Sequence, residues 1–391
     1  MIDAIAAGHL CVDIIPEITD PATATSDSFL VPGRLTEVGR AILSTGGSVA
    51  NTGLALHRLG LDVRLVARLG DDVIAGITRD ILERHDRRLT AHLSVAHGEP
   101  SSYTIVISPP GVDRTFLHCP GTNNTFGPED LPVTLLAETR VLHLGYPPLM
   151  RRMYADGGVE LAMLMKRAKE AGATTSLDLA MPDPAGHSGR ADWRGLLKRV
   201  LPYVDIAQPN VEELLFMLHR DRLEAFQCAP EEVLDALRPA AISALAEELL
   251  AMGVRMVAIK LGHRGFYLRT ATELSDMGRG APASPAAWTG RELWAPCFRV
   301  PVAGTVGSGD ATSAGLITGL LRGQSAEEAL TTAVAVGACN VEAADAISGV
   351  RPWDETQRRI AAGWERLDAR VTGDGWHWDA THSLFRGPAD G

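Results

Sequence analysis

Cysteine is scarce in this sequence, with five residues of this type among 391. The cysteines are odd in number, widely spaced and without a CxxC pair, which indicates neither a disulfide framework nor a zinc site. We therefore expect reduced cysteines in the core, at Cys11, Cys119, Cys228, Cys297 and Cys339.

Positive charge is also in short supply, because 37 Lys and Arg face 48 Asp and Glu and leave a net charge of −11. No Lys/Arg cluster is interleaved with aromatic residues, so nucleic-acid binding is not expected. An anionic ligand would have to be held by local backbone amides and a few side chains.

Long hydrophobic runs are missing as well. The apolar opening, residues 1–16, is too short to span a bilayer, lacks a basic leading region and contains Asp3 and Asp13. We expect it to form the first core strand of a soluble, cytoplasmic protein without membrane contact. No GxGxxG motif follows that strand, which disfavours a dinucleotide-dependent dehydrogenase.

What the chain does carry is a glycine cluster near its C-terminal end. Residues 300–323 place Gly304, Gly307 and Gly309 in a turn, and a helix of small and apolar residues follows from Asp310. Amides at a helix N-terminus form an anion site. Asp310 stands at its mouth, where a carboxylate could take the proton of a hydroxyl that attacks phosphorus. Asp310 would equally suit a helix N-cap, so this motif alone leaves both readings open.

Much of the chain alternates apolar strands with helices, which predicts an α/β fold with a mostly parallel sheet and helices on both faces. We expect core strands at 4–15, 63–72, 141–145, 174–180 and 204–210, and two strands joined by a Gly-flanked turn over 254–268. Ligands bind beyond the carboxyl ends of such strands. The polar or glycine positions expected there are Asp13, Gly145, Asn210, Gly262 and the turn before Asp310.

Two segments depart from that rhythm. Residues 16–44 and a hairpin at 101–119 alternate apolar and polar positions, and together they would form a separate sheet that covers a pocket. Between them, Gly46 and Gly47 make a tight turn before a helix that carries Asn51. The amide of Asn51 and the glycine backbone could face one small polar molecule, although an ordinary helix start explains the same pattern.

The last third of the chain adds three further expectations. Residues 270–294 are rich in Gly, Pro, Ser and Ala and read as a surface insertion. A helix at 325–344 would pack on the glycine-cluster helix. Beyond residue 352 we expect one amphipathic helix, and then a loosely attached tail over 373–391.

Six motifs follow one another along the chain: GHLCVDIIP, TGGSVANTG, RLGDD, QPNVEE, IKLGHRG and GTVGSGDATSAG. In this order and spacing they resemble the ribokinase-like, PfkB-type carbohydrate and nucleoside kinases, over residues 5–349. The resemblance implies an ATP-dependent kinase that phosphorylates a hydroxyl of a sugar or sugar acid. It also implies a ribokinase-like domain over 1–350 with a β lid at about 14–45 and 98–122, a C-terminal helix and tail over 351–391, and a homodimer formed through the lid.

The resemblance assigns a role to each matching position. The catalytic base is Asp310, and the anion hole is formed by Gly307, Ser308 and Gly309. The sugar-binding positions are Asp13, Gly46, Gly47 and Asn51. The positions that organise Mg²⁺ and its waters are Asn210 and Glu213. The positions beside the nucleotide are Lys260, Gly262, Gly265, Thr305 and Asn340.

The sequence departs from the family pattern in three places. The family's cradle usually begins with an Asp that belongs to a monovalent-cation site, but Gly304 stands here, so the resemblance does not extend to a potassium requirement. Ser308 replaces an Ala and still offers its amide. Leu144, Gly145 and Tyr146 stand where several sugar kinases carry a polar residue near the strand end, and the stretch after Asp178 lacks an Asn and an Arg, which leaves Asp183 without a role.

Two alternatives to a sugar kinase remain from the sequence. A nucleoside kinase on the same scaffold would need an aromatic wall for the acceptor's base, for which Phe29, Tyr103 and Phe116 are available. A non-catalytic sugar sensor would share the fold, but it would have no need of Asp310 as a base or of the NxxE element at 210–213. We treat His118, His143 and His263 as ordinary polar residues.

Overall fold

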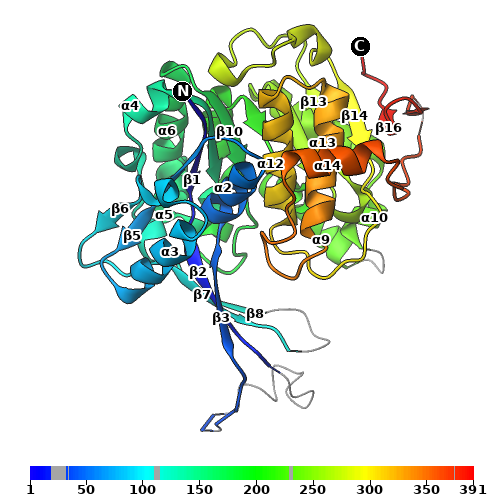
Figure 1. The fold of residues 1–391 in the computed structure, drawn as a ribbon. Helices are drawn as coiled ribbons and strands as arrows, with labels where there is room; N and C mark the ends of the chain where they lie inside the picture. Colours follow the sequence, from blue (N-terminus) through cyan, green and yellow to red (C-terminus); the bar gives the residue numbers. More distant parts are fainter. Residues whose placement is uncertain (19–31, 34, 110–114, 229–231, 374) are drawn as a thin grey trace.

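The fold is organised around one ten-stranded sheet, with strand order β15-β16-β14-β13-β12-β11-β10-β9-β1-β4 (Figure 1). The computed structural model describes residues 1–18, 32–33, 35–109, 115–228, 232–373 and 375–391. The strands from β4 to β12 in that order run parallel, and the others join antiparallel. Their bounds are β1 (Ile2–Gly8), β4 (Val63–Val66), β9 (Thr139–Gly145), β10 (Thr174–Asp178), β11 (Ile206–Ala207), β12 (Met256–Lys260), β13 (Phe266–Thr270), β14 (Glu292–Ala295), β15 (His377–Asp379) and β16 (Leu384–Arg386).

Helices cover both faces of this sheet, as the alternation of strands and helices predicts. The central strands are buried on both sides, which explains why β1 reads as an almost unbroken apolar run. Helices α2, α12 and α13 pack on one face, and α6, α7, α8 and α11 pack on the other. The helices are α2 (Ser48–Arg58), α3 (Val73–Glu83), α4 (Val133–Ala137), α5 (Arg151–Tyr154), α6 (Val159–Glu170), α7 (Trp193–Val200), α8 (Val211–Leu218), α9 (Arg220–Gln227), α10 (Val233–Ala236), α11 (Pro239–Ala251), α12 (Ser308–Leu321), α13 (Ala326–Asn340) and α14 (Trp353–Ala361).

A second, four-stranded sheet projects from the body at the bottom of Figure 1. It consists of β3 (Ala41–Gly46), β2 (Cys11–Pro16), β7 (Tyr103–Ile107) and β8 (Thr115–Cys119), in that order. The 101–119 hairpin enters the same sheet as β3 of the earlier excursion, but it pairs with β2 at residues 12–14, which the sequence placed in the core strand. Phe29 and the strand expected near it lie outside the described residues. The homodimer through this sheet stays a prediction.

Four sequence expectations about the fold are wrong in part. The strand expected at 4–15 breaks after Gly8, so β1 lies in the main sheet and β2 in the four-stranded sheet. The strand expected at 63–72 breaks at Ala67, so β4 joins the main sheet while β5 (Arg68–Gly70) pairs with β6 (Ser94–Ala96) in a small separate sheet. The stretch at 270–294 is not a surface insertion, because Met277 and Trp288 are buried and its end forms β14. Cysteines are not confined to the core either, since Cys228 is exposed.

The C-terminal tail is the largest correction. It is not loosely attached, because β16 pairs with β14 and β15 pairs with β16, which extends the central sheet. Each of these strands has only three residues. Strands this short carry almost no periodic signal in the sequence.

In the part of the chain that the structure describes, no helix combines the length and apolar character needed to cross a membrane.

Candidate active site

The N-terminus of α12 forms one end of the site. Helix α12 begins at Ser308, and its N-cap is Gly307 in the left-handed conformation, with φ of 69°. A Cβ at Gly307 would lie 2.9 Å from the carbonyl oxygen of Ala346, so only glycine fits without a shift. The first amides of a helix have no partner within the helix. This turn therefore presents donors and the positive end of the helix dipole, as the glycine cluster predicts.

Asp310 lies on the first turn of α12, but it does not cap that helix. Its side chain, 2% exposed, accepts hydrogen bonds at Oδ2 from Asn51 Nδ2 (3.0 Å) and the Tyr146 hydroxyl (2.7 Å). Its Oδ1 accepts from Thr52 Oγ1 at 3.1 Å. The N-cap reading is therefore wrong, because Gly307 holds that position. A carboxylate offers about four acceptor sites, so Oδ1 can still accept one further hydroxyl.

A second buried cluster centres on Lys260 at the end of β12. Its Nζ donates to Asp178 Oδ1 at 2.6 Å, so Lys260 is not a solvated strand-end lysine. Against the effect of burial, the carboxylates of Asp178, Glu213 and Asp310 raise the pKa of Lys260, which stays charged. Burial raises the pKa of Asp178 to about 7 even though Lys260 opposes the shift. One ammonium thus faces three carboxylates, and Asp178 Oδ2 has no hydrogen-bond partner.

Asn210 and Glu213 form a capping box at the start of α8. Asn210 Nδ2 donates to Glu213 Oε1 at 2.7 Å, and the Glu213 amide donates to Asn210 Oδ1 at 2.8 Å. Asn210 also pairs by a β-bridge with Lys260, which brings this motif beside the lysine cluster. The two side chains hold each other in place, and both line the cavity described in the next paragraph.

A cavity of about 630 Å³ joins these elements. Its polar end contains Asp310, Lys260, Glu213 and the first turn of α12. The rest of its lining is largely apolar, with Phe266, Phe298, Val300, Val334, Val341 and Leu367 among the lining residues. Gly262, Gly265 and Thr305 line the cavity as the nucleotide assignment requires. Asn340 does not line the cavity, and its Nδ2 donates to the Ala346 carbonyl, so its place beside the nucleotide stays a prediction.

The expected acceptor residues gather on the opposite side of Asp310. Asp13 lies on β2 against Gly46, where a Cβ would approach Asp13 Oδ2 to 2.3 Å. Gly47 begins α2, and Asn51 on the first turn of α2 reaches Asp310. Asp13, Gly46 and Gly47 do not line the large cavity. Through its hydrogen bond to Asp310, Asn51 therefore connects the expected acceptor residues to the proposed catalytic base.

Sequence reasoning missed three residues at this site: Tyr146, Thr52 and Asp178. Tyr146 follows β9 with a left-handed backbone (φ 65°), and its amide donates to the Asp178 carbonyl at 3.2 Å. Burial and Asp310 raise the pKa of Tyr146 well above its usual range, so its phenol remains a donor. Asp178 is the last residue of a parallel strand, and this position could have identified it as a site residue from the sequence. No pattern in the sequence marks Tyr146 or Thr52.

His9 lies close to Tyr146, and His118, which the sequence analysis treated as an ordinary polar residue, lies close to His9. The ring centroid of His9 lies 6.0 Å from that of Tyr146 and 5.3 Å from that of His118 on β8. Burial lowers the pKa of His9 to about 3, so its ring is neutral. The rings of His118 and His9 thus connect the four-stranded sheet to Tyr146, whose hydroxyl contacts Asp310.

Comparison with known proteins gives concordant matches. The sequence matches the pfkB family of carbohydrate kinases over residues 10–353. An uncharacterized sugar kinase of Archaeoglobus fulgidus is 24% identical over 70% of this chain and 89% of that protein. The ATP-dependent ribose-1-phosphate kinase of Halopiger xanaduensis is 25% identical over 86% of this chain and 91% of that protein. The structure of Arabidopsis thaliana ribokinase complexed with ribose and ATP superposes with a TM-score of 0.68 at 18% identity, over 91% of this chain and 98% of that chain, which is a similarity of fold.

Proposed function

This chain belongs to the pfkB family of carbohydrate kinases, and on that premise we propose that it transfers the γ-phosphoryl group of ATP to a hydroxyl of a small sugar with Asp310 as the base. One observation carries the proposal. The buried carboxylate of Asp310 lies where the amides of α12, the Lys260 cluster and the Asn51 side chain converge. A base at the junction of a phosphate site and an acceptor site is what phosphoryl transfer to an alcohol needs.

The transfer can be written with these residues. The acceptor hydroxyl donates to the open position on Asp310 Oδ1, and its oxygen attacks the γ-phosphorus as Asp310 takes the proton. The bond from that phosphorus to the oxygen bridging the β- and γ-phosphates breaks, and ADP leaves. The amides of Gly307, Ser308 and Gly309 stabilise the charge on the transferring group. Lys260 lies beside Gly309, since a Cβ there would be 3.6 Å from Lys260 Nζ, and it adds positive charge at the same end.

Magnesium fits this end of the cavity. Three carboxylates face one ammonium there, and the buried Asp178 Oδ2 lacks a partner, so the cluster can accommodate further positive charge. Among the described residues no three His, Cys, Asp or Glu side chains are grouped to hold a metal ion directly. A hydrated Mg²⁺ held by nucleotide phosphates, with Asn210 and Glu213 accepting from its waters, agrees with both facts. When bound, it would neutralise phosphate charge during transfer.

Asp13 is proposed to bind the acceptor. Its carboxylate lies beside Gly46 at the root of the four-stranded sheet, where it can accept hydrogen bonds from sugar hydroxyls. We expect Asp13→Ala to raise the acceptor KM by about tenfold or more, since charge-assisted hydrogen bonds contribute about 1.5–3 kcal/mol, and to leave the ATP KM unchanged. Steady-state kinetics with each substrate varied measures this, and Asp71→Ala, an exposed carboxylate, is the control. An equal rise in both KM values would exclude Asp13 as an acceptor ligand.

Tyr146 is proposed to position the base. The change Tyr146→Phe removes one of three donors to Asp310, so we expect kcat to fall by about tenfold while the ATP KM stays within twofold. Tyr267→Phe is a matched control, because that buried phenol donates to Glu292 at 2.8 Å, and neither residue lines the cavity. A comparable loss in the Tyr267 variant would attribute the effect to general destabilisation.

The first experiment is an ADP-release assay with Mg-ATP and a panel of neutral sugars, sugar acids, sugar phosphates and nucleosides. Asp310→Asn is the blank, so only release that this variant lacks counts as transfer. We expect the signal among the sugars or sugar phosphates, because one sequence relative described above is named a sugar kinase and the other a ribose-1-phosphate kinase. Transfer to nucleosides alone would favour the nucleoside kinase. ATP binding without transfer to any compound would contradict the proposed acceptor class.

A further inference from the structure

Two segments far apart in the sequence contribute to the apolar lining of the cavity. Cys297, Phe298 and Val300 come from the stretch after β14, and Leu367 comes from the stretch after α14. We call residues 296–300 and 364–367 together the base wall. The family match ends at residue 353. Leu367 is therefore the lining residue that comes from outside the matched region of the chain.

The two segments of the base wall are joined by backbone hydrogen bonds. The amide of Arg299 donates to the Glu365 carbonyl, and the amide of Leu367 donates to the Cys297 carbonyl, both at 2.8 Å. The bridge between Phe298 and Arg366 is antiparallel. This pairing fixes the register, so the side chain of Leu367 cannot shift along the wall without breaking both bonds.

Aromatic stacking reinforces the same pairing. The rings of Phe298 and Trp364 stack with centroids 4.3 Å apart, and the Arg366 guanidinium lies 3.8 Å from the centroid of Phe298. The Arg359 guanidinium lies 3.7 Å from the centroid of Trp364 and pairs with Glu342, next to the lining residue Val341. The base wall is thus packed from behind as well as hydrogen-bonded along its edge.

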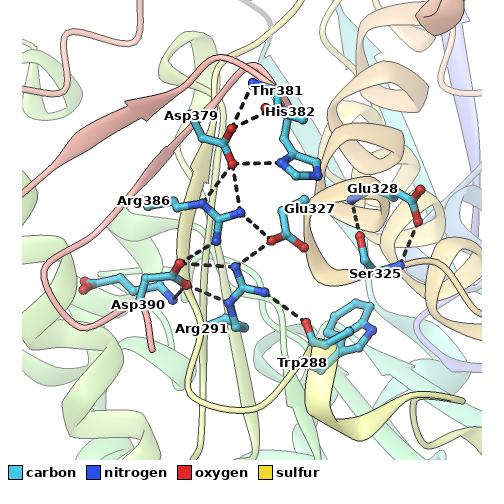
Figure 2. A network of polar contacts seen from close by, with 12 residues as sticks. Trp288, Arg291, Ser325, Glu327, Glu328, Asp379, Thr381, His382, Arg386 and Asp390 are labelled. Atoms are coloured by element: carbon cyan, nitrogen blue, oxygen red, sulfur yellow. Dashed lines mark hydrogen bonds and ion pairs between the residues drawn. The ribbon is translucent and has the colours of Figure 1, made fainter.

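The chain beyond the base wall is anchored by a network of buried charges (Figure 2). Arg291 donates to Glu327 at 2.6 Å and to Asp390 at 2.7 Å, and Arg386 donates to the same two carboxylates at 2.8 and 2.7 Å. The side chains of Arg291, Glu327 and Asp390 are each less than 10% exposed. The network ties the tail to the start of α13 and to the residue before β14, the strand that leads into the base wall.

From this geometry we propose that residues 364–367 complete the nucleotide site, with Leu367 contacting the adenine ring of ATP. The proposal rests on the proposed function, because it follows from placing the phosphates at the α12 end of the same cavity. A triphosphate there directs the adenine base toward the apolar lining, where flat aromatic rings bind to aliphatic side chains. Nucleotide affinity then depends on a segment that lies beyond the family match.

Two probes distinguish a contact with the adenine base from an effect on the whole cavity. A non-hydrolysable ATP analogue carries the base and the phosphates, whereas inorganic tripolyphosphate carries only the phosphates. We expect Leu367→Ala to raise the calorimetric Kd of the analogue by about tenfold, because a partly buried apolar contact is lost. The Kd of tripolyphosphate should stay within twofold of its wild-type value. The sugar KM should not change.

Val371→Ala is the matched control, because Val371 is buried a little further along the chain but does not line the cavity. It should bind both probes as wild type does. Leu367→Gln, which keeps the side-chain volume, gives the same comparison if the alanine variant does not fold. Unchanged binding of the analogue, or equal weakening of both probes, would overturn the proposal. A wild-type protein that binds neither probe would instead overturn the proposed function.

Discussion

Asp310→Asn is expected to lower kcat for sugar phosphorylation by about a thousandfold while ATP affinity stays within a few-fold. The structure explains why the loss should be chemical. An asparagine oxygen in the place of Oδ2 can accept from Asn51 and Tyr146, and its amide can donate to the Thr52 hydroxyl. All three neighbours thus keep a partner, but the side chain can no longer take a proton.

The control for this variant is Asp205→Asn. Asp205 is a fully buried carboxylate that pairs with Lys169 and Thr175, and it does not line the cavity. Its replacement should lower the free energy of unfolding and leave kcat close to wild type. Rapid-quench measurement of a single turnover isolates the chemical step in both variants. If Asp310→Asn transfers phosphate within tenfold of wild type, the base must be another group.

Lys260→Met should have the largest effect on stability. It leaves the buried carboxylates of Asp178 and Glu213 without their cation, and breaking a buried pair costs about 3–5 kcal/mol. We expect transfer to be lost as well, because Lys260 lies beside the first turn of α12. Lys169→Met breaks another buried pair, with Asp205 outside the cavity, and should destabilise the fold without abolishing transfer.

The effect of Lys260→Met should also depend on pH. A carboxylate whose pKa is raised on folding binds more protons in the folded state, so stability falls as pH rises from its unfolded pKa to its folded pKa. For Asp178 in the wild type this window runs from 3.8 to about 7. Without Lys260 the pKa of Asp178 should rise further, so the variant continues to lose stability above pH 7. Urea unfolding at pH 5 and pH 8 should therefore show the larger difference from wild type at pH 8.

Local motifs predicted much of the site because their chemistry is encoded in neighbouring residues. The turn at Gly307 needs a left-handed backbone, and the NxxE pair at Asn210 and Glu213 closes on itself within one helical turn. The order of strands and helices likewise predicted the parallel part of the sheet. These features depend on contacts within a few residues, which a sequence displays directly.

The features that the sequence did not reveal depend on distant partners. Tyr146 becomes a donor to Asp310 only because its backbone turns left-handed against Asp178. Asn340 faces Ala346 because the chain after α13 folds back toward that helix. Strands β15 and β16 exist because β14 supplies an edge for pairing. In each case the decisive atoms lie on another segment, so no local pattern marks them.

The arrangement of the C-terminal segment has a spectroscopic consequence. Of the seven tryptophans, Trp364 is stacked on Phe298 within the base wall, whereas Trp294 and Trp376 meet edge-to-face in the core cluster that contains α7, α8 and α11. The described acceptor side is built instead from Asp13, Asn51 and the rings of His9 and Tyr146. We therefore expect nucleotide binding to change the fluorescence of Trp364, and sugar binding to leave it unchanged, so the two ligands could be told apart without attaching a dye.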